Sequence, residues 1–141
     1  LSEPQPLPAN SLPERIDMRN ALRVEAAFEE NAASKTWAMV AGKTVDQFGP
    51  PLFSVKRGRA AVMAFPNRDN FGHAIHLHGH HVRLLDNLDD GWKPFWLDTV
   101  MVGARQTARI AFVADNPGKW MLYAQRLEHP EIGMTAWFEV T

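Results

Sequence analysis

Hydrophobic and polar positions alternate at the start of the segment over residues 22–28, where Leu22, Val24, Ala26 and Phe28 recur at every second position. A period of two, rather than 3.6, places alternate side chains on opposite faces of an extended chain. We therefore predict a half-buried β-strand over residues 22–28.

Similar apolar segments recur at intervals of about ten residues, which is typical of all-β domains. Turn-forming Gly, Pro, Asn and Asp residues separate them, and no helical apolar stripe runs through the chain. The further expected strands are Trp37–Val40, Leu52–Val55, Ala60–Phe65, His81–Leu85, Thr107–Val113, Lys119–Tyr123 and Thr135–Val140. Many short, evenly spaced strands predict an all-β fold, an antiparallel sandwich or barrel.

The first part of the chain has a different composition. Four prolines lie between Pro4 and Pro13, and proline favours extended chain with few internal hydrogen bonds. We predict an extended leader or interdomain linker over residues 1–19. Residues 20–141 then form one domain of ordinary size.

Charge and hydropathy exclude two classes of partner. The 15 basic and 16 acidic side chains are nearly balanced and form no run of like charge, so neither nucleic acid nor a membrane surface is indicated. No apolar stretch approaches the roughly 20 residues that span a bilayer. The chain starts without a recognisable signal peptide. It contains no cysteine, so no thiolate is available for a metal.

Five of the six histidines lie within residues 73–81. Imidazole is a common ligand for copper and zinc, so this segment is the first candidate for a metal site. If it is extended, His76, His78 and His80 face one way while His73 and His81 face the other. One short segment could therefore serve two different sites.

Four blocks carry a family resemblance. They are Phe48-Gly49-Pro50-Pro51-Leu52-Phe53, His73-x-x-His76-x-His78-Gly79, Gly91-Trp92 to Asp98-Thr99, and Gly118-x-Trp120 through His129 to Gly133-Met134. In this order and spacing, from about residue 20 to the end, the chain resembles the C-terminal cupredoxin domain of multicopper oxidases, the laccase-like enzymes. The resemblance implies a cupredoxin-like Greek-key β-sandwich or barrel and copper as the cofactor.

The resemblance also implies roles for particular residues. His73 would be a ligand of the type 1 blue copper, together with His129 and the axial Met134. His76 and His78 would be ligands of the trinuclear cluster that reduces dioxygen. The family is exported, which implies a periplasmic or secreted parent protein.

One tripeptide departs from the family pattern. Where the family has His-Cys-His, this chain has Tyr123, Ala124 and Gln125. A blue copper site needs a thiolate, which an alanine methyl cannot replace. The trinuclear cluster loses two imidazoles, and in the family half of that cluster comes from another domain. Natural loss of copper and deliberate replacement of the motif would both give this sequence.

Three functions remain open. In the first, His76 and His78, with His80 or His81, hold a single copper or zinc ion, and a homo-oligomer formed through the former interdomain surface completes the site. In the second, the chain is a metal-free structural scaffold that self-associates through that surface. In the third, an open copper site makes it a weak oxidase. Asp98 is a candidate to orient a ligating imidazole, although it also suits an ordinary turn.

Overall fold

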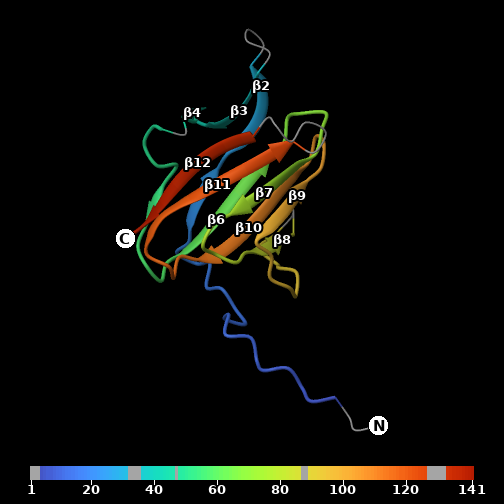
Figure 1. The fold of residues 1–141 in the computed structure, drawn as a ribbon, viewed down its shortest axis with the longest axis vertical. Helices are drawn as coiled ribbons and strands as arrows, with labels where there is room; N and C mark the ends of the chain where they lie inside the picture. Colours follow the sequence, from blue (N-terminus) through green and yellow to red (C-terminus); the bar gives the residue numbers. More distant parts are fainter. Residues whose placement is uncertain (1–3, 32–35, 47, 87–88, 127–132) are drawn as a thin grey trace.

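The computed structural model describes residues 4–31, 36–46, 48–86, 89–126 and 133–141. Within these ranges every regular element is a β-strand, which confirms the predicted all-β class. Figure 1 shows the strands stacked in one body, with the N-terminal segment extending away from it.

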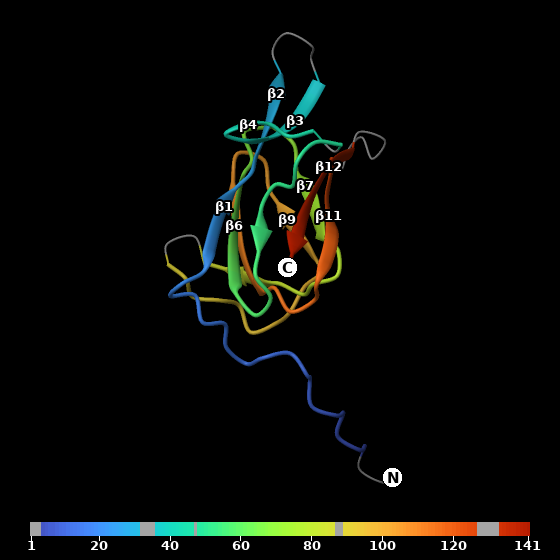
Figure 2. The same ribbon diagram turned by 90° about the vertical axis from the view of Figure 1, so that its left-hand side faces the viewer.

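Two sheets form the sandwich (Figure 2). The first has the order β1-β6-β10-β8. Its strands are β1 (Leu22–Glu25), β6 (Ala60–Pro66), β10 (Thr107–Val113) and β8 (Arg83–Leu85). The second has the order β5-β12-β11-β7-β9. Its strands are β5 (Ser54–Val55), β12 (Gly133–Val140), β11 (Gly118–Arg126), β7 (His73–Leu77) and β9 (Thr99–Val102). Neighbouring strands such as β7 and β11 are far apart in sequence, as in Greek-key folds.

A third, smaller sheet contains β2 (Ala27–Asn31), β3 (Thr36–Ala41) and β4 (Lys43–Thr44). The prediction of one strand over residues 22–28 is therefore wrong in its extent. The chain leaves the first sheet at Ala26, whose N–H donates to the carbonyl of Ala64, and then enters the third sheet. Alternation of side chains alone does not reveal this change of partner strand.

The main core lies between the two large sheets. Phe28, Phe65, Phe112 and Phe138 are fully buried there. Aromatic side chains bury the most apolar surface per residue, so they dominate the stability of a small sandwich.

The outer faces of the two sheets differ. A second apolar cluster, in which Ile16 is 4% exposed, covers the outer face of the first sheet, with Trp92 and Trp96 packed against it. The five-stranded sheet instead leaves Met101 and Met121 exposed, at 55% and 39%. The chain thus covers the outside of one sheet and leaves apolar side chains uncovered on the other.

Candidate functional site

Strand β7 positions the first histidines by the alternation of its side chains. Its burial pattern places His73 and Ile75 in the interior and His76 on the outer face. The predicted division of His73 and His76 between opposite faces is confirmed.

His73 lies in a closed environment. Its Nε2 is 3.0 Å from Oδ2 of Asp69, and both side chains are fully buried. Its ring packs on Phe28 at 4.9 Å between centroids. A carboxylate oxygen accepts, so in the neutral ring Nε2 carries the hydrogen and Nδ1 has the lone pair that a metal requires.

The residues across the sheet from β7 define what this interior position can bind. Ala124 on β11 lies opposite Ile75 on one side and Met134 on the other, and its side chain is fully buried. Met134 is also buried, at 6% exposed. Position 124, where the family resemblance implies a cysteine, therefore presents only a methyl group to the core. These residues do not fit a blue copper ion.

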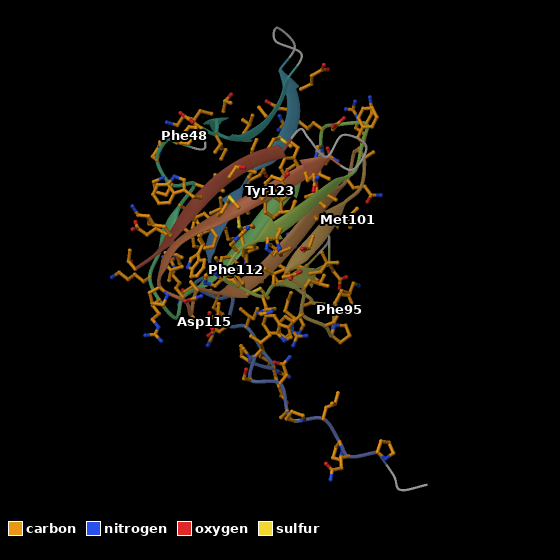
Figure 3. All side chains as sticks on the ribbon, viewed as in Figure 1. Phe48, Phe95, Met101, Phe112, Asp115 and Tyr123 are labelled. Carbon is orange, nitrogen blue, oxygen red and sulfur yellow. The ribbon has the colours of Figure 1, made fainter. Side chains whose placement is uncertain are left out.

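The outer face carries a second group. The rings of His76 and His78 lie 4.7 Å apart in an edge arrangement. Nδ1 of His76 is 3.0 Å from the hydroxyl oxygen of Thr99 on the neighbouring strand β9. Tyr123 lies opposite His76 on β11, and Figure 3 shows Tyr123 and Met101 on strands of the same sheet. Two imidazoles thus stand together at the uncovered surface.

His80 departs from the predicted alternation, which holds through His78 and is wrong beyond it. The chain turns at Gly79, whose φ is 72°, and His80 enters the core at 5% exposed. It packs against Phe112, Trp120 and Phe138 instead of joining His76 and His78. His81 is exposed at the end of the sandwich.

Burial also changes the chemistry of His80. Its Nδ1 lies 3.2 Å from the backbone oxygen of His78, so Nδ1 carries a hydrogen that it donates. Desolvation lowers the pKa of His80, because the aromatic surroundings disfavour the charged ring. The bond to His78 and the charge of Asp115 oppose this effect, and they are the smaller influences.

The described residues bring together only part of the predicted ligand set. His129 lies outside them. No group of three or more His, Cys, Asp or Glu side chains suited to a metal occurs within the described ranges. His73 and Met134 face the interior, whereas His76 and His78 face outward.

Sequence reasoning missed both residues that orient the histidines. Asp69 holds His73, and Thr99 contacts His76, whereas Asp98 is exposed and contributes its backbone oxygen to Leu77. Asp69 lies in a segment rich in Asn and Asp, and this composition predicts only a turn.

The β-sandwich, with its histidine-bearing strand β7 between β11 and β9, has the cupredoxin-like fold of multicopper oxidases. Residues 15–141 match the multicopper oxidase family model, and the chain belongs to that family. It is 36% identical over 80 residues to multicopper oxidase MmcO of Mycobacterium tuberculosis, covering 57% of this chain and 16% of that protein. It is also 36% identical over 81 residues to laccase-6 of Arabidopsis thaliana, covering 48% and 14%.

Solved structures give the same assignment. A multicopper oxidase from Pseudomonas parafulva superposes with a TM-score of 0.74 at 28% identity, covering 99% of this chain and 34% of that chain. One from Pseudomonas thermotolerans gives 0.73 at 31% identity, with the same coverage. The chain thus spans about a third of these structures.

No helix in the described ranges has the length and hydropathy to cross a bilayer.

Proposed function

We propose that this chain is a multicopper oxidase cupredoxin domain without a blue copper site, in which His76 and His78 hold one copper ion at a surface shared with a second protein body. Zinc is the alternative ion. The pairing of the two rings at 4.7 Å on the outer face is the observation that carries this proposal. The parent protein would be periplasmic or secreted, as the family resemblance implies.

Thr99 supports the choice of His76 as a ligand. When Nδ1 of His76 donates its hydrogen to the Thr99 hydroxyl oxygen, Nε2 keeps its lone pair. Fixing one ring nitrogen in this way orients the other toward a metal and makes it a better ligand. In this domain Thr99 is therefore the positioning residue for His76.

Two imidazoles fill only part of a coordination sphere, because stable sites for copper or zinc take three or four protein ligands. The described residues offer no third His, Cys, Asp or Glu beside them. The exposed methionines of the same sheet, Met101 and Met121, are the kind of apolar surface that a second body covers. We propose a second copy of the chain as that body, so that a twofold axis brings four imidazoles to one ion.

The same surface supports an alternative function. If Met101 and Met121 drive self-association without a metal, the chain is a structural scaffold. The predicted linker over residues 1–19 is compatible with both functions. Residues 4–15 lie before the first buried side chain, Ile16, which packs on the domain.

A copper titration of metal-free protein tests the proposal. We expect one copper per two chains, nitrogen hyperfine structure in the EPR spectrum, and a doubling of mass by light scattering as copper is added. His76→Ala and His78→Ala should each abolish stoichiometric binding. His81→Ala is the matched control, because it removes an exposed imidazole of the same segment.

The results separate the two functions. A dimer that forms equally in the metal-free protein, with no bound copper, would establish the scaffold instead. Copper binding that persists when His76 and His78 are both replaced by Ala would show that other ligands hold the ion.

A further inference from the structure

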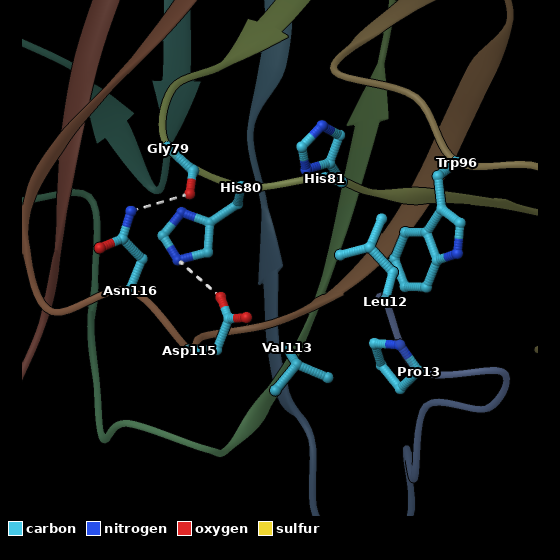
Figure 4. Close-up of a pocket in the computed structure, with 9 residues that line it drawn as sticks. All are labelled: Leu12, Pro13, Gly79, His80, His81, Trp96, Val113, Asp115 and Asn116. Carbon is cyan, nitrogen blue, oxygen red and sulfur yellow. Dashed lines mark hydrogen bonds and ion pairs between the residues drawn. The ribbon is translucent and has the colours of Figure 1, made fainter. Parts of the chain in front are cut away.

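A cavity of about 300 Å³ opens at the end of the sandwich, beyond the turn at Gly79 (Figure 4). Residues from four parts of the chain line it, and the first is the turn that carries Gly79, His80 and His81. Leu12 and Pro13 come from the N-terminal segment, Trp96 from the loop before β9, and Asp115 from the turn after β10. This cavity is separate from the outward pair of His76 and His78.

A buried nitrogen lies at its polar side. Nε2 of His80 has no hydrogen-bond partner among the described residues, although the side chain is only 1% exposed. Because Nδ1 carries the hydrogen donated to the His78 backbone oxygen, Nε2 is an acceptor in the neutral ring. A buried polar atom without a partner is costly, so a donor that reaches it would bind favourably.

Asp115 stands between this nitrogen and solvent. Its Oδ1 is 4.0 Å from Nε2, and its side chain is 64% exposed. His80 and Asp115 both line the cavity, and no side-chain hydrogen bond to another described residue holds this carboxylate. Nε2 of His80 and Oδ1 of Asp115 are both hydrogen-bond acceptors, and the Asp115 carboxylate is negatively charged.

The remaining walls set the shape of the ligand. Leu12, Pro13, Val113 and Trp96 supply apolar surface. The guanidinium of Arg83 lies 4.5 Å from the centre of the Trp96 ring, which occupies one face of the indole. Trp96 therefore contributes apolar contact to a ligand, and Asp115 supplies the charge.

We propose that this cavity binds a small organic ammonium cation with an apolar body. Its N–H groups donate to the Asp115 carboxylate and to Nε2 of His80. Two acceptors 4.0 Å apart can be bridged by one donor atom about 2.9 Å from each. The apolar body lies against Trp96 and the N-terminal segment.

Titration of 15N-labelled protein with 2-phenylethylammonium, in EDTA so that metal binding does not contribute, tests this site. We expect saturable amide shifts at Gly79, Asp115 and Asn116, and a shift of the Nε2 resonance of His80. Asp115→Asn should weaken binding about fivefold, because it removes the charge at nearly constant shape. Glu139→Gln is the control, since it removes one negative charge from strand β12.

Neutral and anionic analogues define the ligand class. 2-Phenylethanol should bind at least about fivefold more weakly than the ammonium, and phenylacetate should not bind. The proposal is overturned if the alcohol binds as tightly, if Asp115→Asn binds like wild type, or if no saturable shift develops up to millimolar ligand. Asp115 is exposed, so its variant is expected to fold, and the amide spectrum verifies this directly.

Discussion

Gly79 lies directly against the indole ring of Trp120, so closely that a methyl group on its α-carbon would overlap the ring. Its φ of 72° is also in the region that favours glycine. This contact fixes the turn between His78, which faces outward, and His80, which enters the core. The turn is therefore what separates the surface pair from the buried histidine.

Gly79→Ala should destabilise the domain by about 2–5 kcal/mol, through positive φ and overlap with Trp120 together. Gly42 has the same φ of 72° but nothing within 4 Å of the added methyl, so Gly42→Ala should cost only about 1–2 kcal/mol. Urea unfolding of the two variants measures the difference. Equal losses would show that Trp120 moves aside without cost.

The sequence predicted the all-β class because period-two alternation and turn residues are local signals. Strand β10 was predicted with its observed limits, Thr107–Val113. Strand β9, Thr99–Val102, was missed, since it is short and follows a segment rich in Trp and Pro. Strand β9 is defined by its pairing with β7. The local pattern of hydrophobic and polar residues does not reveal which strands pair.

The candidate site, like the fold, could be predicted only where the local pattern of side chains decides the structure. Alternation placed His73 and His76 on opposite faces of β7, because the strand is regular there. The predicted alternation failed at His80, because Gly79 adopts a left-handed conformation and the turn there directs the His80 side chain into the core. Asp69 and Thr99 could not be assigned, because their contacts depend on a turn geometry and a strand register that the sequence does not state.

Asp69 and His73 form a fully buried pair, and breaking it leaves a buried N–H without its acceptor. Asp69→Ala should therefore lower the free energy of unfolding by about 1–3 kcal/mol. Glu29→Ala, which breaks the surface pair with Arg68, should change it by at most about 1 kcal/mol. Chemical denaturation of both variants at neutral pH provides the comparison. A loss for Asp69→Ala as small as that for Glu29→Ala would contradict the buried pair.

His80 should make stability depend on pH in metal-free protein. Burial lowers its folded pKa, whereas in the unfolded chain the value is near 6.5. As pH falls below about 6.5 the unfolded state takes up the proton first, so stability is fully present above that pH and is lost as pH falls through the folded pKa.

The measurement is the melting temperature between pH 8 and pH 5 in EDTA. His80→Phe, which suits the surrounding aromatic rings, should reduce the slope at the acid end, since it removes the group that titrates. His81→Phe removes an exposed imidazole and controls for the lost charge. If His80→Phe keeps the full wild-type slope, another group causes the pH dependence.

Ala124→Cys tests whether the interior site has lost only its sulfur. The new thiol would project into the core from the position opposite Met134, on the same inner face as His73. We expect copper(II) to give this variant an intense sulfur-to-copper absorption in the red that wild type lacks, because a thiolate is the ligand that produces it. The added sulfur should cost about 1 kcal/mol through overpacking.

Ala136→Cys is the matched control. Ala136 is equally buried on β12 but lies opposite Leu122, two pairs further from His73. A thiol at this position should give no such band, because it lacks the neighbouring donors. Red absorption in both variants would show nonspecific thiolate binding. Its absence in Ala124→Cys would mean that the remaining ligands do not converge on position 124, so that more than the cysteine has been lost.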